Sequence, residues 1–151
     1  MFTIKKLLIA SSILAFITVI NFSIAKESDL SKPNAAKGSL KLVMQGLLAD
    51  TQALTAAMLI EDFTSIEKIA KEIADHPKPS METRMKLMKA MGTEMAKFKI
   101  HDGVVHGAAV NMVKNAQNKD IKAIGENFQN MIGGCVSCHR EFKARVSAIF
   151  M

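Results

Sequence analysis

The chain has 151 residues, and its formal net charge of +6 comes from 20 basic and 14 acidic side chains. No run of lysine and arginine concentrates this charge, and tyrosine and tryptophan are absent. The composition therefore argues against a nucleic-acid-binding protein. The charged side chains are expected to lie on the solvated faces of helices.

Residues 1–25 have the three parts of a cleaved secretory signal peptide. Two lysines form the positive part, residues 7–20 are apolar and uncharged, and Ser23 and Ala25 suit a cleavage site. The uncharged part is shorter than the ~20 apolar residues that span a bilayer, which favours removal over a membrane anchor. The mature chain is predicted to begin at Lys26, in the bacterial periplasm or an equivalent oxidising compartment.

Residues 26–151 are predicted to form one domain of 126 residues with a single core. Once the two signal-peptide lysines are removed, 18 basic and 14 acidic side chains remain, a net charge of +4. A charge of this size steers an acidic protein partner weakly and adds little to affinity.

Apolar residues recur at threes and fours through most of this domain, which predicts an almost entirely helical fold. A first helix is predicted to open at Gly38 or Ser39, and Asp62 to cap a shorter second helix. The stretch 76–79, with two prolines, then breaks the pattern because each proline disfavours helical geometry in the residue before it.

Ser80 is predicted to cap a third helix. Its methionines recur at threes and fours from Met81 to Met95, which indicates a packed apolar stripe rather than a set of ligands. The pattern continues past Gly103, so one long helix is expected before the polar turn at 115–119.

Asp120 is predicted to cap the last helix, whose apolar pattern is the most regular in the chain. Residues seven apart make up its inward face, namely Ile121, Phe128, Cys135, Phe142 and Ile149, with the companions Ile124, Met131 and Cys138. A seven-residue repeat is typical of helices packed at shallow angles in a bundle.

The sequence Cys-Val-Ser-Cys-His at 135–139 lies on this inward face and is typical of covalent haem attachment. The thiols of Cys135 and Cys138 would add to the two porphyrin vinyl groups, and the imidazole of His139 would reach the iron. Positions i, i+3 and i+4 share one face of a helix, so the three side chains can meet a single haem.

Gly133 and Gly134 stand just before the attachment motif. Each glycine costs about 1 kcal/mol in a helix interior. In one interpretation, the missing side chains make room for the haem plane or for a neighbouring backbone. In the other, the two glycines mark only a local irregularity of the helix without functional meaning.

Other chemistries of a Cys-x-x-Cys pair fit less well. Thiol–disulfide exchange usually places the pair beside a strand, and zinc would need a second pair of ligands. The other histidines are His76, His101 and His106, and they supply no such pair. A disulfide between cysteines three residues apart would close a very small loop. A helical protein without haem, in which the two cysteines form a redox-active thiol pair, remains an alternative.

The histidines outside the motif have plainer explanations. His76 lies in the proline-rich connection and is expected to be solvated. His106 follows Asp102 by four residues, which favours a pair on the helix surface over iron ligation. His101 has no predicted role.

A secreted all-α chain of this length, with Cys-x-x-Cys-His in its last helix, resembles the class II c-type cytochromes, the group of cytochrome c′ and its low-spin relatives. The resemblance covers essentially the whole mature chain. It is most specific at 134–143, and the stretch 95–106 adds weaker support. It implies an all-α, antiparallel four-helix bundle with one covalently bound haem between the helices. The family often forms homodimers that pack through the first two helices, and the sequence leaves open whether this chain is a monomer or such a dimer.

The family divides at the sixth iron position. Low-spin members close it with a methionine from the first helix, whereas cytochrome c′ leaves it open behind an apolar side chain. Met44 lies where the resemblance puts the low-spin ligand and shares a helix face with Leu47 and Leu48. Met58, further along the helix, is expected to lie too far from the haem. Thioether ligation raises the reduction potential, which suits electron transfer.

The sequence thus predicts a periplasmic one-electron carrier with haem c attached at Cys135 and Cys138 and its iron held by His139 and Met44. An enzyme is not predicted, since no nucleophile is paired with a base. Larger periplasmic or membrane-bound redox proteins are the expected partners. The alternative is a protein like cytochrome c′, with five-coordinate iron that binds nitric oxide or carbon monoxide.

Overall fold

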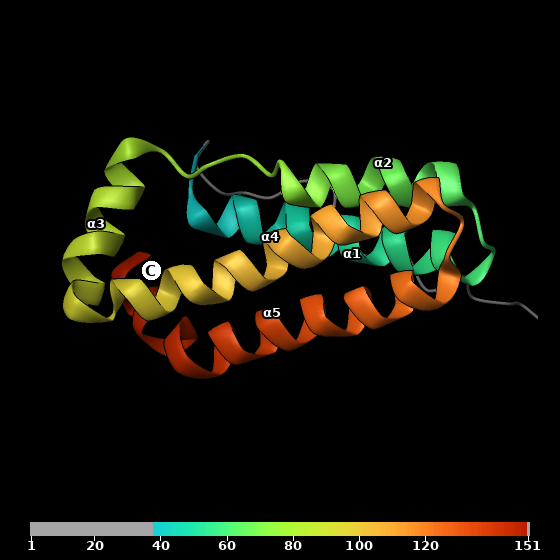
Figure 1. Ribbon diagram of the computed structural model, residues 1–151. Helices are drawn as coiled ribbons and strands as arrows, with labels where there is room; N and C mark the ends of the chain where they lie inside the picture. Colours follow the sequence, from blue (N-terminus) through green and yellow to red (C-terminus); the bar gives the residue numbers. More distant parts are fainter. Residues whose placement is uncertain (1–37, 151) are drawn as a thin grey trace, which may run out of the picture.

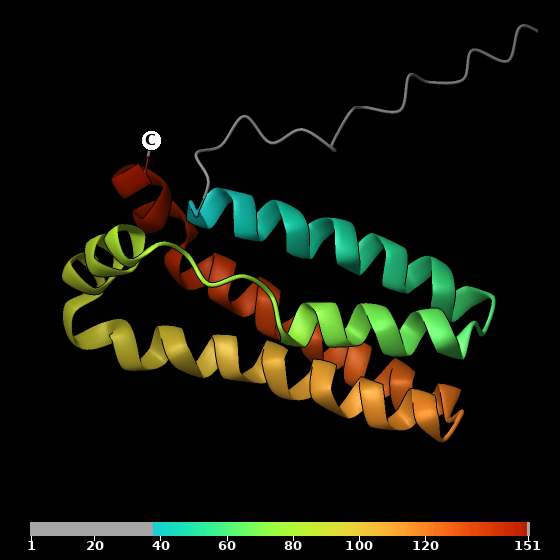
Figure 2. The same ribbon diagram turned by 90° about the horizontal axis from the view of Figure 1, so that it is seen from above.

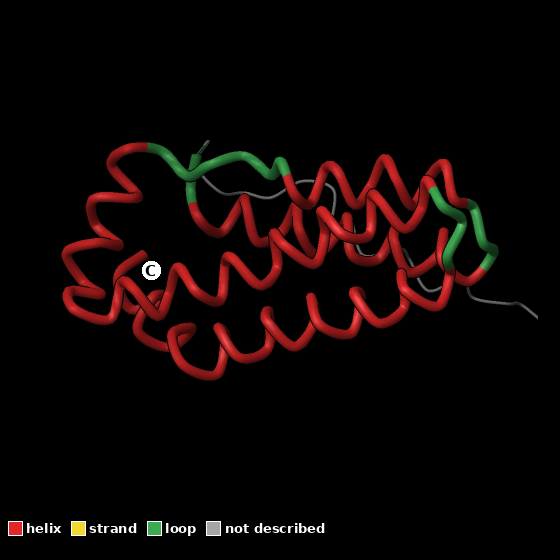
Figure 3. The backbone as a smooth tube through the Cα atoms, in the orientation of Figure 1, coloured by secondary structure: helices red, strands yellow, loops and turns green. Residues whose placement is uncertain are grey.

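The computed structural model describes residues 38–150, and every regular element within that range is a helix (Figure 3). In chain order these are α1 (Leu40–Leu59), α2 (Phe63–Ala74), α3 (Met81–Met91), the 3-10 helix η1 (Gly92–Glu94), α4 (Met95–Gln117) and α5 (Ile121–Phe150). The predicted signal peptide at 1–25 and the first part of the predicted mature domain lie outside the described residues.

Four long helices pack as an antiparallel bundle, which confirms the predicted fold class (Figure 1). α1 packs against α2, α2 against α4, and α4 against α5. Figure 2 shows α1, α2 and α4 following one another across the bundle, with α5 on its far side. Direct backbone contact between α1 and α5 is sparse, so the bundle is least closed between these two helices.

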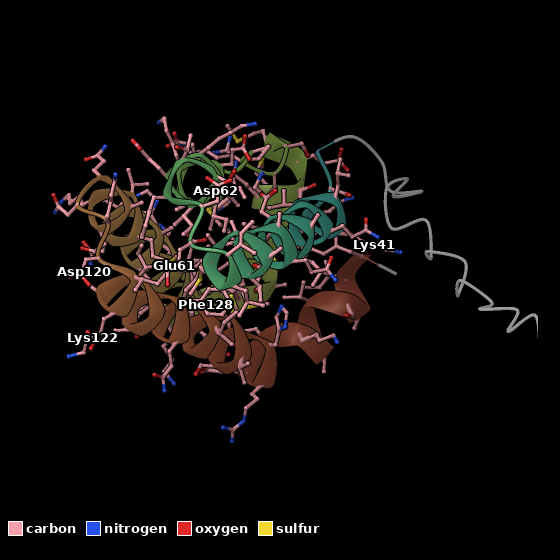
Figure 4. All side chains as sticks on the ribbon, turned by 90° about the vertical axis from the view of Figure 1, so that its right-hand side faces the viewer. Lys41, Glu61, Asp62, Asp120, Lys122 and Phe128 are labelled. Atoms are coloured by element: carbon pink, nitrogen blue, oxygen red, sulfur yellow. The ribbon has the colours of Figure 1, made fainter. Side chains whose placement is uncertain are left out.

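The helices begin at the predicted caps. The side chains of Ser39, Asp62 and Ser80 each accept a hydrogen bond from the backbone N–H three residues on. Asp120 accepts one from the Ala123 N–H at 3.0 Å. These bonds satisfy donors that the first turn of a helix leaves free. Figure 4 looks along the bundle from the end where Asp62 and Asp120 open α2 and α5.

The main core lies between the four long helices. Its largest side chains are almost fully buried and come from all four: Leu54, Ile66, Ile73, Met112, Ile124 and Met131. Burying a side chain of this size contributes about 1.5–3 kcal/mol, so these residues hold the bundle together.

The predicted third helix is in fact two helices joined by a short 3-10 turn. α3 ends at Met91, and Gly92 has a φ of +52°, in the left-handed region that favours glycine. A glycine just past the last helical residue is a common helix stop. The apolar period runs on across the break, which is why periodicity alone predicted one continuous helix.

The prediction of a packed methionine stripe is wrong for the first part of this region. Met81, Met85 and Met88 are 61%, 59% and 47% exposed, whereas Met91 is buried. α3 stands across the end of the bundle, beside the last turns of α5 (Figures 1 and 2). It buries a different face there, because Leu87 and Met91 pack with Phe142 in a second cluster.

By length and composition, α1 is the one helix within residues 38–150 that could cross a membrane. In the bundle it buries Val43, Leu54 and Ala57, and it leaves Met44 and Leu48 exposed. α1 therefore presents apolar side chains toward the open side of the bundle as well as toward its core.

Candidate functional site

A largely apolar groove, here called the α1–α5 groove, lies toward the α3 end of the bundle. Its lining comes from three helices and from the connection between α2 and α3: Met44, Leu47, Leu48, His76, Phe98, His101, Asp102, Val105, Cys135, Cys138 and His139. All four residues predicted to bind the haem and its iron are therefore brought to one groove, three from α5 and one from α1.

The attachment motif occupies one face of α5. Cys135, Cys138 and His139 follow the i, i+3, i+4 spacing within a continuous helix. Both cysteines are free and half-buried, and His139 is exposed. Nothing in the helix has to move for the three side chains to meet one planar group beside α5.

The electrostatic surroundings of the two thiols disfavour a redox-active thiol pair. Burial raises the pKa of Cys135, and burial together with the negative charges of Cys135, Asp102 and Glu141 raises that of Cys138. Cysteines of thiol–disulfide exchange have a lowered pKa instead, because the thiolate is the nucleophile. Within residues 38–150, no group of three His, Cys, Asp or Glu side chains could hold a metal ion, which also leaves zinc without its ligands.

Met44 lies on the α1 side of the groove. It is 39% exposed and lines the groove with Leu47 and Leu48, as their shared helix face predicted. Met58, the later methionine of α1, packs against the main core instead. The structure thus separates the two methionines of α1, with Met44 the one beside the attachment motif.

α4 contributes a wall that the sequence reasoning missed. Phe98, His101, Asp102 and Val105 line the groove at the helical spacing i, i+3, i+4, i+7. That spacing is visible in the sequence, but two of the four residues are polar, so the apolar pattern did not mark them as one face.

A polar contact joins α4 to α5 next to the motif. The Nε2 of His101 lies 3.0 Å from Glu141 Oε2, and Lys97 Nζ lies 3.6 Å from Glu141 Oε1. The hydrogen bond from His101, helped by the charge of Lys97, lowers the pKa of the Glu141 carboxyl. An exposed contact of this kind adds little stability, so its effect is mainly on the orientation of the side chains.

Two predictions for the histidines were wrong. His76 is not solvated, because its side chain is 20% exposed, lines the groove and places Nε2 3.8 Å from Asp102 Oδ1. His106 does not pair with Asp102, and its Nδ1 lies 3.0 Å from the carbonyl oxygen of Ala74. The reason is the packing of α2 against α4, which brings the unsatisfied carbonyls at the end of α2 to His106.

The two glycines before the motif have different surroundings. A Cβ on Gly134 would lie 3.0 Å from Val104 Cγ1 and 3.1 Å from Val105 Cγ2. A Cβ on Gly133 would meet nothing within 4 Å. The space at Gly134 is therefore taken by α4 side chains, which pack directly against the α5 backbone.

The donor set of the groove fits haem c. Two thiols and an imidazole stand on one helix face, a thioether lies on another wall, and most of the remaining lining is apolar. The groove has a volume of about 180 Å³, below the ~300–1,000 Å³ of most ligand pockets. The groove would accordingly hold only part of a porphyrin unless α1 and α5 move apart, and few backbone contacts between these two helices oppose that movement.

The comparisons with known proteins point to one family. A family model described as Cytochrome C' matches residues 34–143, a stretch that contains every residue of the groove. No curated protein and no solved structure matches the chain.

Proposed function

The chain belongs to the cytochrome c′ family, and on this premise we propose that it carries single electrons in the periplasm. The family binds one haem c per chain, and its members are generally haem proteins without enzymatic activity. We further infer that His139 and Met44 are the iron ligands. The observation that carries it is that these two residues, from α5 and α1, line the same groove.

Cys135 and Cys138 would hold the haem covalently. Each thiol would add across a vinyl group, with a carbon–sulfur bond at one vinyl carbon and a hydrogen at the other. The raised pKa of both thiols favours their neutral form, which suits an apolar wall. Their placement on one helix face fixes the haem relative to His139.

His139 and Met44 would ligate the iron through an imidazole nitrogen and a thioether sulfur. When bound, haem c supplies an iron that takes up or releases one electron. The thioether of Met44 favours the reduced state and raises the reduction potential. Leu47, Leu48 and Val105 line the same groove with apolar side chains, which would lower the polarity around a bound haem.

The proposed compartment and partners follow from the N-terminal sequence and from the chemistry. Residues 1–25 have the composition of a signal peptide, and the family is typically periplasmic. A one-electron carrier exchanges electrons with larger periplasmic or membrane-bound redox proteins. Mass spectrometry of the periplasmic fraction tests the predicted start of the mature chain at Lys26.

The optical spectrum of the purified holoprotein tests the ligand assignment. A far-red sulfur-to-iron band in the ferric protein and slow reaction with carbon monoxide are expected. Met44→Leu should remove the band and allow rapid binding of carbon monoxide, while Met58→Leu, a matched control on the same helix, should change neither. An unaltered low-spin spectrum in Met44→Leu would show that the assignment of Met44 is wrong.

The same measurement decides between this function and gas binding. An unmodified protein with a high-spin spectrum and rapid binding of carbon monoxide would have an open sixth position. That outcome would replace the electron carrier with the alternative, a five-coordinate protein that binds nitric oxide or carbon monoxide. The apolar lining of Leu47, Leu48 and Phe98 suits small neutral gases equally well.

A further inference from the structure

Three methionines on α3 form an exposed surface, here called the methionine face, that has no part in the groove. Met81, Met85 and Met88 are 61%, 59% and 47% exposed. Their spacing, i, i+4, i+7, confines them to about 60° of the helix circumference. Side chains three and four apart have Cβ atoms about 5–6 Å from each other, so the three thioether sulfurs can converge on one point.

We propose that the methionine face binds a soft monovalent metal ion, Cu(I) or Ag(I), through the three thioether sulfurs of Met81, Met85 and Met88. Thioethers are soft, neutral ligands that select Cu(I) over harder cations. Methionine is unbranched and has three rotatable bonds, which lets neighbouring sulfurs adjust to a common ion. The site is separate from the α1–α5 groove and does not depend on the proposed electron carrier.

The side chains around the methionine face restrict the site to soft ions of low charge. Glu82, the one carboxylate in α3, is held by Lys86 at 2.7 Å and has a lowered pKa from that hydrogen bond and charge. Arg84, Lys86 and Lys89 add positive charge to the same short helix. Divalent cations, which need carboxylate or imidazole ligands, are disfavoured here by both charge and ligand type.

The sulfur of Met81 already acts as an acceptor at the surface. Arg84 Nη2 donates to Met81 Sδ at 3.7 Å, so this sulfur is accessible at the surface, and a metal ion would displace the guanidinium from it. The core side of α3 is occupied by Leu87 and Met91, which pack with Phe142. The methionine face lies roughly 100° around the helix from these two residues, so metal binding there does not need the side chains that pack α3 on α5.

The test is titration of the ferric holoprotein with Ag(I) by calorimetry in chloride-free buffer. The holoprotein is used because free thiols of a haem-free chain would bind Ag(I) themselves, and Ag(I) is used because it needs no reductant. One Ag(I) per chain is expected. Met85→Leu should weaken binding about tenfold or more, and the triple variant Met81→Leu, Met85→Leu, Met88→Leu should abolish it. Zn(II) should not bind.

Leucine has nearly the volume and helix propensity of methionine, so these variants should keep the fold, which circular dichroism and the haem spectrum check. The control is the Met58→Leu variant, which should bind Ag(I) as tightly as the unsubstituted protein. Three results would each overturn the proposal: an original chain that binds no Ag(I), a triple variant that still binds it, and equal weakening by Met58→Leu and Met85→Leu. If the triple variant fails to fold, the single-variant comparison decides.

Discussion

The main core and the α1–α5 groove are built from similar side chains, yet one is closed and the other is open. In the main core, leucine, isoleucine and methionine side chains from four helices are almost fully buried, with Leu54 and Met112 at 0% exposure. At the groove, Met44 and Leu48 are 39% and 47% exposed although they belong to the same helix as Leu54. The difference lies in the neighbours of α1, because Leu54 packs in the main core whereas Met44 and Leu48 line the α1–α5 groove.

The difference in exposure indicates that the helices fold around the main core, and on the proposed function the haem would complete the groove. An exposed apolar side chain gains free energy when a ligand covers it. Residues of the main core should therefore govern the stability of the chain itself, whereas residues of the groove should govern what the chain binds.

Cys135→Ser combined with Cys138→Ser should remove covalent haem completely from protein made in cells with haem-attachment machinery. The hydroxyl cannot replace the thiol in adding to a vinyl group. Haem staining of a denaturing gel measures this, and Ser137→Ala, in the same motif, should retain the stain. Covalent haem in the double variant would mean that the groove is not the attachment site.

Leu54→Ala should lower the free energy of unfolding by about 2–5 kcal/mol, because it leaves a cavity in the main core. Leu48→Ala, the same substitution six residues earlier in α1, should change it by about 0.5 kcal/mol or less in the haem-free chain. Urea unfolding followed by circular dichroism measures both. Equal effects, or a haem-free chain without a cooperative transition, would contradict the division between core and groove.

Gly134→Ala should cost about 1–3 kcal/mol, because the added methyl meets Val104 and Val105 at close to 3 Å. Gly133→Ala should instead stabilise α5 by up to about 1 kcal/mol, since nothing lies within 4 Å of its added carbon. The two variants differ only in which side of α5 receives the methyl group. Thermal unfolding of both compares them, and a destabilising Gly133→Ala would show that this glycine too is needed for close packing.

The smallest expected effect is a dependence of stability on pH in the haem-free chain. Burial raises the pKa of Cys135 and Cys138 above their ordinary value of 9.0. Well below pH 9 both thiols are neutral in the folded and the unfolded chain. As pH rises past this value the unfolded thiols ionise first, so the free energy of unfolding should fall until the pH exceeds the folded pKa values and then level off.

Urea unfolding at pH 8 and pH 10 measures this loss of stability, with the double serine variant as the control that should lack the thiol contribution. Thiolate absorbance that develops below pH 9 in the folded chain would show that the raised pKa values are wrong.

The sequence predicted the parts of the fold that depend on local chemistry. The predicted helix caps are confirmed because a side-chain oxygen accepts a hydrogen bond from a free backbone N–H within the same turn. They are Ser39, Asp62, Ser80 and Asp120. The attachment motif could be predicted for the same reason, since its three residues lie on one turn of one helix.

Features that depend on how helices meet could not be predicted in the same way. The exposure of Met81 follows from α3 crossing the end of the bundle, and the pairing of His106 with Ala74 follows from α2 lying beside α4. Periodicity identifies which residues share a face, but it does not say which neighbour that face meets. The roles of His76 and His101 in the groove were missed because both lie on walls that only tertiary packing assembles.

The continuity of α5 has a consequence for how fast an electron could move. The helix runs without interruption from Met131, buried in the main core, to Phe142, buried in the second cluster against Phe98 at a ring distance of 5.5 Å. The attachment motif lies between these two anchors, within about three turns of helix. A segment held on both sides shifts little when a nearby charge changes, so its reorganisation free energy should be small. The rate of electron exchange would then be set by the approach of the partner and not by rearrangement of α5.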